Sequence, residues 1–184
     1  MEVSDSQILD KLKDGDPLAY NQLFDKYYMP LCVYSLKYCD SFQLAEDIVQ
    51  DFFVKIWDEK IYLKFEDPMS PYLFKAIKNN TLQAIKKQSR FQFDAIEKMV
   101  NNLIEEEPLD FANLEEEKKI LFQQLEALPE KSKAVFKAIV LENLKYKEVA
   151  ERLDISVNTV KTHYSRALKQ LRLRLDIIII LLMV

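Results

Sequence analysis

Apolar residues recur every three or four positions through most of the chain, a spacing that predicts helices. The first helix is expected over residues 6–13. A second is expected after Asp16, a good N-cap residue, because Pro17 suits the first helical position. The pattern predicts that this helix stops near Tyr28 and that Pro30 opens a third.

The clearest helical pattern covers residues 42–58, with Asp40 or Ser41 as the expected cap. Its apolar residues form one broad stripe: Ala45, Ile48, Val49, Phe52, Phe53, Ile56 and Trp57. The other side carries Asp47, Gln50, Asp51, Val54, Lys55 and Asp58. We expect the stripe to pack in a core, which leaves the other side at the surface.

A further helix is expected over residues 72–88. Between Lys75 and Arg90 the chain has five basic residues and no acidic one. One side of this helix gathers Lys75, Lys78, Asn79, Gln83, Lys86 and Arg90. In a chain whose net charge is −4, such a local basic face is typical of a nucleic-acid-binding surface.

The chain then becomes strongly acidic. Residues 94–118 hold nine acidic side chains against two lysines, and Pro108 interrupts them. This composition is typical of a solvated spacer, so we predict a partly helical, mobile linker over 93–118. The linker would join a domain over 1–92 to a second domain over 119–176, with an apolar tail over 177–184.

Two short helices in the second domain have the spacing of a helix-turn-helix. They are expected over residues 146–153 and 157–173, and Asp154-Ile155-Ser156 joins them. Ala150 is small enough for a close helix crossing. Ser156 is the expected cap of the second helix.

The second helix of this pair has two different sides. Its inward residues are Val157, Val160, Tyr164, Ala167, Leu168 and Leu171. Its outward residues are Asn158, Thr159, Thr162, Ser165, Arg166 and Lys169, with Lys161 and Arg172 at the flanks. These outward residue types pair with base edges and phosphates, and residues 145–174 hold eight Lys or Arg against three acids. We expect Arg166 to reach base edges and Lys161 to bind a phosphate.

Composition narrows the remaining classes of fold and function. One glycine and six prolines argue against a β-rich fold, and helix formers dominate, so we expect an all-α protein. His163 is the only histidine, and no metal spacing, catalytic triad or phosphate loop is present. The sequence therefore predicts no enzyme, no cofactor and no small-molecule substrate.

The two cysteines and the residues at both ends of the sequence favour an intracellular protein. Cys32 and Cys39 are expected to be reduced core thiols. The first residues are polar and acidic, which does not predict a signal peptide. The eight apolar residues 177–184 are too few to span a bilayer and favour a terminal helix turn packed on the last domain. Contact with a membrane or a partner is the alternative for this tail.

Two segments resemble conserved regions of one family. Residues 45–53, Ala-Glu-Asp-Ile-Val-Gln-Asp-Phe-Phe, together with Trp57, are similar to region 2 of sigma-70 family factors. The similarity to region 4 of the same family covers residues 128–131, 146–151, 155–162 and 165–168. Because both regions occur in order with an acidic linker between them, the chain is identified as a member of the extracytoplasmic-function group. The resemblance covers nearly the whole chain except the linker and the tail.

Three positions depart from the pattern of this family. Asp154 and Asn143 stand where glycine is common, and both residue types tolerate a left-handed backbone. Lys145 replaces a capping serine, so the first helix of the pair is expected to fray. None of the three changes removes an outward residue of the second helix.

The resemblance implies an alternative sigma factor that binds RNA polymerase core and promoter DNA. Region 2 would bind polymerase through Asp47, Gln50, Asp51, Lys55 and Asp58. The basic helix would bind the −10 element through Lys75, Lys78, Asn79, Gln83, Lys86 and Arg90. Tyr62, Phe65 and Tyr72 are available for base stacking there, although core packing is favoured for each. The −35 element would be read in the major groove by Asn158, Thr159, Lys161, Thr162, Ser165, Arg166 and Lys169. The expected location is cytoplasmic, with an anti-sigma factor, often membrane-anchored in this family, as a further partner.

Two other interpretations stay open. A non-sigma helix-turn-helix regulator would not need residues 45–57 and would usually carry an α/β phosphoacceptor domain. A sigma-like adaptor that binds polymerase but not DNA would not need Arg166, Lys169 or the basic helix.

Overall fold

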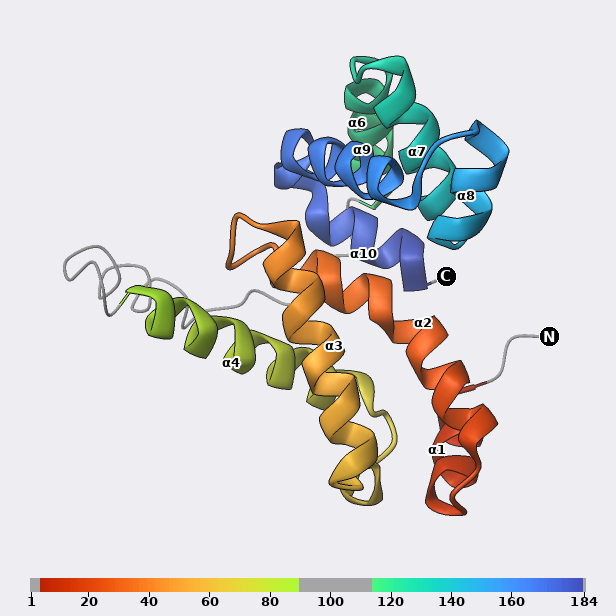
Figure 1. The fold of residues 1–184 in the computed structure, drawn as a ribbon, viewed down its shortest axis with the longest axis vertical. Coiled ribbons are helices and arrows are strands. Elements are labelled where there is room, and N and C mark those ends of the chain that lie inside the picture. Colours follow the sequence, from red (N-terminus) through yellow and green to blue (C-terminus); the bar gives the residue numbers. More distant parts are fainter. Residues whose placement is uncertain (1–3, 90–113, 184) are drawn as a thin grey trace. The chain divides into compact units, whose positions relative to one another are not determined.

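The computed structural model describes residues 4–89 and 114–183 (Figure 1). Every regular element in these two ranges is a helix, and the chain divides into two compact units, Met1–Glu106 and Glu107–Val184. The predicted all-α fold with two small helical domains is therefore confirmed. Arg90 and most of the predicted linker lie outside the described residues, so the linker stays a prediction.

The N-terminal unit contains four α-helices and a short 3-10 helix in its described part. They are α1 (Asp5–Lys13), α2 (Pro17–Ser35), α3 (Phe42–Asp58), η1 (Ile61–Lys64) and α4 (Ser70–Ser89). The predicted caps are present: Asp16 Oδ1 accepts from the Leu18 N–H at 2.8 Å, and Ser41 Oγ accepts from the Leu44 N–H at 3.2 Å. These caps satisfy backbone donors that the first turn leaves open, which fixes where the helices begin.

The predicted break at Pro30 is wrong, because α2 continues through it to Ser35. A proline inside a helix removes one backbone hydrogen bond and costs about 3 kcal/mol. Burial offsets this cost: Leu31, Cys32 and Val33 are all fully buried beyond the proline. Each large apolar side chain buried in this way contributes about 1.5–3 kcal/mol.

The helix α2 forms the centre of the N-terminal unit and contacts α1, α3 and α4. Tyr27, Phe53, Ile56 and Leu73 fill this core with almost no exposed surface. The same packing fixes which side of α3 and of α4 remains at the surface.

The C-terminal unit is built from shorter helices. They are α6 (Leu114–Glu126), α7 (Glu130–Val140), α8 (Tyr146–Leu153), α9 (Val157–Gln170), η2 (Arg172–Arg174) and α10 (Leu175–Met183). Phe136, Ile139, Tyr164 and Leu168 form its core, and α9 packs mainly on α7 and α8.

The apolar tail lies in α10, which contacts α6 and α7 as a terminal helix packed on the last unit. The chain reaches α10 through η2, so α9 ends at Gln170, three residues earlier than predicted. Arg174 Nη1 donates to Glu117 Oε2 at 2.6 Å and ties this junction to α6. In the described segments, the helices are too short or too polar to cross a membrane.

Both residues expected in a left-handed conformation adopt it: φ is 53° at Asn143 and 51° at Asp154. A side chain in this region crowds the next carbonyl, which costs about 1–2 kcal/mol for most residues, while glycine is free of the cost.

Asp154→Gly should therefore raise the free energy of unfolding of the C-terminal unit by about 0.5–1 kcal/mol. Asp154→Val should lower it by about 1–2 kcal/mol, because β-branched residues rarely adopt this conformation. Urea denaturation of the full chain, followed by circular dichroism, measures both changes. Equal stability of the glycine and valine variants would contradict this account of the turn.

Candidate nucleic-acid and protein interfaces

Hydrogen bonds within the turn fix the geometry of the helix-turn-helix. Asp154 ends α8, and the Ile155 N–H donates back to the Ala150 carbonyl at 3.0 Å. Ser156 Oγ then accepts from the Thr159 N–H at 3.0 Å and starts α9, as predicted. Ala150 is almost buried, which lets the two helices cross closely.

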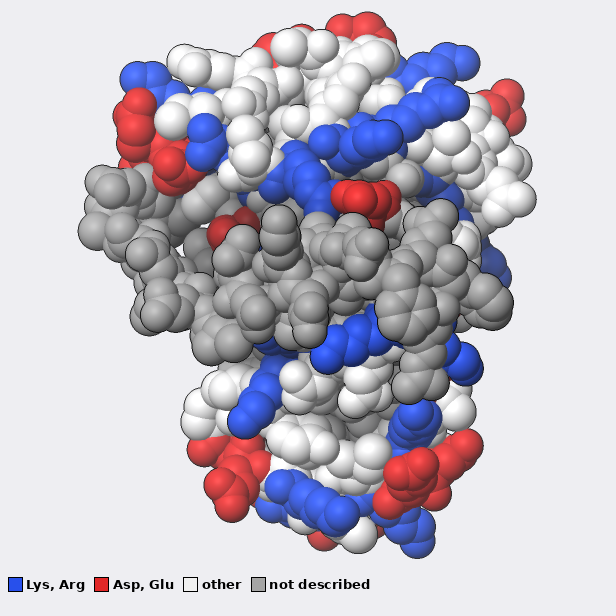
Figure 2. Space-filling model, turned by 90° about the vertical axis from the view of Figure 1, so that its left-hand side faces the viewer, with Lys and Arg blue, Asp and Glu red and all other residues white. Residues whose placement is uncertain are grey.

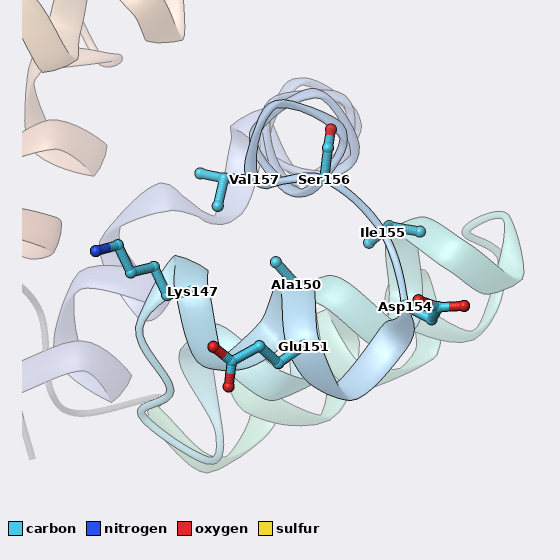
Figure 3. Close-up of a pocket in the computed structure, with 7 residues that line it drawn as sticks. All are labelled: Lys147, Ala150, Glu151, Asp154, Ile155, Ser156 and Val157. Carbon is cyan, nitrogen blue, oxygen red and sulfur yellow. The ribbon is translucent and has the colours of Figure 1, made fainter.

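A shallow groove of about 520 Å³ follows the outside of this turn (Figure 3). Ala150, Ile155 and Val157 give it an apolar part, while Lys147 and Glu151 lie on its α8 side.

The first turn of α8 lacks a side-chain cap at Lys145, as its residue type implies. Glu148 compensates for part of this loss, because its Oε2 accepts from the Lys145 N–H at 2.7 Å. The ammonium of Lys161 also lies 5.5 Å from the centre of the Tyr146 ring, which links α9 to the start of α8.

The predicted outward residues of α9 form one continuous surface, which we call the α9 outer face. It consists of Asn158, Thr159, Lys161, Thr162, Ser165, Arg166 and Lys169, all exposed or half-buried. Val160, Tyr164, Ala167 and Leu168 are buried on the opposite side, as predicted. In Figure 2, lysine and arginine side chains form a row on the C-terminal unit.

Two hydroxyl groups of the α9 outer face are already used within the helix. Thr159 Oγ1 lies 2.8 Å from Ser156 Oγ in the cap. Thr162 Oγ1 donates to the Asn158 carbonyl at 2.9 Å and keeps its lone pairs as acceptors. Asn158, Arg166 and Lys169 are also exposed on this face.

Arg166 and Lys169 also line a cavity of about 200 Å³ between the start of α7 and the second half of α9. Ser132 Oγ and His163 Nδ1 lie 3.1 Å apart in its wall. Burial and the charges of Arg166 and Lys131 lower the pKa of His163, which favours the neutral imidazole. The charge of this region therefore comes from arginine and lysine.

The basic side predicted on α4 is also formed. Lys75, Asn79, Gln83 and Lys86 are exposed, and Lys78 is half-buried with its ammonium 5.7 Å from the centre of the Tyr38 ring. We call these five residues the α4 basic face. Leu73, Ile77 and Thr81 are buried on the other side, so packing orients the whole row outward.

Of the three aromatic residues offered for base stacking, only one is accessible. Tyr62 and Phe65 are buried, so they are core residues. Tyr72 is 42% exposed at the start of α4 and lies against Phe65, with ring centres 5.0 Å apart.

The polar side of α3 also lies at the surface as expected. Asp47, Gln50, Asp51, Lys55 and Asp58 are all exposed, and we call them the α3 outer face. Trp57 was predicted in the core stripe but is 38% exposed at its border, with its ring 4.9 Å from that of Tyr20. The sequence prediction overlooked Glu46, which is buried within the stripe and only 1% exposed. The available signal was its place one helical turn from two apolar residues, Phe42 and Val49.

No cluster in the described ranges could hold a metal ion, and both cysteines, Cys32 and Cys39, are buried. What the structure exposes is a set of polar and basic surfaces.

Comparison with known proteins agrees with this division into two units. A family model described as "Sigma-70 region 2" matches residues 23–91, and one described as "Sigma-70, region 4" matches residues 118–171. The chain is 24% identical over 180 residues to the ECF RNA polymerase sigma-E factor of Escherichia coli (strain K12), covering 90% of this chain and 91% of that protein. It is 23% identical over 175 residues to the protein of the same description from Haemophilus influenzae, covering 90% and 92%.

Proposed function

The chain belongs to the extracytoplasmic-function group of the sigma-70 family, and from this premise we propose how its surfaces divide the work of initiation. It is an alternative sigma factor that directs transcription initiation, with RNA polymerase core and promoter DNA as its partners. Sigma factors act by binding, without chemistry of their own. The observation that carries the proposal is that each matched region presents its own basic, outward-facing helix.

The α3 outer face is proposed to bind the polymerase core. Its opposite side is already packed against α2 and α4, so these polar side chains are the part of α3 that a partner can reach. Three carboxylates among the five residues suit a partner surface rich in N–H donors.

The α4 basic face is proposed to hold the −10 element. Strand opening exposes phosphates and unstacked bases. Lysines bind the phosphates, and an aromatic ring stacks on an unstacked base. Tyr72 supports this role because it is exposed on the same helix. Arg90, which lies outside the described residues, is proposed for the same role.

The α9 outer face is proposed to read the −35 element. A recognition helix enters the major groove with its first residues nearest the bases, which assigns base contacts to Asn158, Thr159 and Thr162. Arg166 lies about two turns further along and has a planar fork suited to guanine. Lys161, Ser165 and Lys169 are assigned to phosphates.

Two further parts of the proposal are supported only by membership of the extracytoplasmic-function group. An anti-sigma factor is proposed as the partner that holds the protein inactive, and in this family such a partner is often anchored in the membrane. The cytoplasm is proposed as its location, because RNA polymerase works there.

The proposal is tested by transcription in vitro with purified core enzyme on a library of genomic fragments. We expect the protein to co-elute with core in gel filtration and to start transcripts at a small set of promoters with shared −35 and −10 sequences. Core enzyme without the protein is the control. Failure to co-elute and to direct specific starts would contradict the proposed function.

A further inference from the structure

A buried carboxyl group lies directly beneath the α3 outer face. Glu46 is 1% exposed, although Asp47 beside it is exposed. A carboxyl group that has lost water needs hydrogen-bond donors in the protein. Tyr28 on α2 supplies one, because its hydroxyl donates to Glu46 Oε1 at 3.3 Å.

The same hydroxyl accepts a hydrogen bond from the surface. Gln50 Nε2 donates to the Tyr28 hydroxyl at 2.9 Å. Glu46 and Gln50 are one turn apart on α3, so a single phenol from α2 can bridge them. The three side chains form a continuous path from the exposed face to the buried carboxyl.

The hydrogen-bond directions along this path orient Gln50. Tyr28 donates to Glu46, which leaves its lone pairs for Gln50, and the amide must present N–H to them. Burial raises the pKa of Tyr28 far above its ordinary value, so the phenol keeps its proton. The ring is also held in place by stacking on Phe24, with ring centres 4.7 Å apart and planes 18° apart. With its nitrogen bonded to Tyr28 on α2, the exposed Gln50 keeps its carbonyl oxygen as an acceptor for a partner.

We propose that Tyr28 is a positioning residue for polymerase binding: anchored on Glu46, it fixes Gln50 so that the amide carbonyl faces the polymerase. This inference rests on the proposed role of the α3 outer face. A side chain that is ordered before binding loses less rotamer entropy in the complex than a free one.

The test is the affinity of the full chain for core polymerase, measured by fluorescence titration. Tyr28→Phe removes the hydroxyl and keeps the stacked ring, so we expect affinity to fall about three- to tenfold. Gln50→Ala should cause a similar loss. The double variant should bind no more weakly than Gln50→Ala alone, because the hydroxyl then has no side chain to position.

Tyr20→Phe is the matched control. Its hydroxyl also joins α2 to α3, but it donates to the backbone carbonyl of Phe53, at 2.8 Å, and to no side chain of the α3 outer face. This control should lower the unfolding temperature about as much as Tyr28→Phe does and leave affinity for core within about twofold. If Tyr28 contributed only to stability, Tyr28→Phe and Tyr20→Phe would have similar unfolding temperatures and similar affinities for core.

Additive losses in the double variant, or equal affinities of Tyr28→Phe and Tyr20→Phe, would overturn the proposal. If Tyr28→Phe does not fold, Glu46→Gln replaces it: this change weakens the anchor, and its loss of affinity should also vanish when Gln50 is alanine. A loss that persists there would again overturn the proposal. The proposed function fails in a different way, since the wild-type chain would then not bind core at all.

Discussion

With Asp47 and Asp51 both replaced by lysine, we expect the affinity of the protein for RNA polymerase core to fall about a hundredfold or more. The two carboxylates are exposed on the α3 outer face, one turn apart. Charge reversal at an interface removes an attraction and adds a repulsion, and like charges brought together cost several kcal/mol. The change reaches no core residue, so the helix content should be unchanged.

The double variant Asp10→Lys/Asp14→Lys is the control for the change in net charge. Both residues are exposed at the end of α1 and do not belong to the α3 outer face, and the variant changes the charge by the same amount. It should bind core like the wild-type chain. If both variants lose affinity equally, the loss reflects overall charge and the α3 outer face is not the polymerase contact.

On promoter DNA, Arg166→Ala should change which −35 sequences are preferred. Losing a base-reading arginine typically costs about 1–3 kcal/mol and relaxes specificity at one position. Arg166 is exposed and therefore free to reach a base edge. The measurement is transcription from a promoter library by reconstituted holoenzyme at two salt concentrations, because polymerase positions this unit on DNA.

Lys161→Ala provides the comparison in the same assay. Its ammonium lies over Tyr146 at the flank of α9, where a phosphate contact is expected. Loss of such a contact should weaken all sequences evenly and reduce the salt dependence by about one unit of slope. If Arg166→Ala has the same even effect, Arg166 binds a phosphate; if it has none, the α9 outer face is not the reading surface.

The sequence alone predicted the bounds of a helix correctly where several local signals agreed. The helix α3 has the predicted bounds because Ser41 supplies a cap and a broad apolar stripe follows it. The turn of the helix-turn-helix was predictable for the same reason, since Asp154 and Ser156 are suited to the backbone they adopt. Local chemistry and tertiary packing favour the same structure at these positions.

The sequence misled where tertiary contacts outweigh local preference. Proline normally ends a helix, yet α2 continues past Pro30 because the residues after it are buried by other helices. The accessibility of Tyr72, in contrast to Tyr62, depends on the path of the loop before α4 and has no signature in the residue type. The pairing of Tyr28 with Gln50 joins two helices and could not be found from spacing within one.

The link between Arg174 and Glu117 has a consequence for engineering. It brings the beginning of α10 against the first turns of α6, so the helices that open and close the C-terminal unit are neighbours. The first and last helices of this unit therefore support each other, so a transplantable version of the C-terminal unit should keep both α6 and α10.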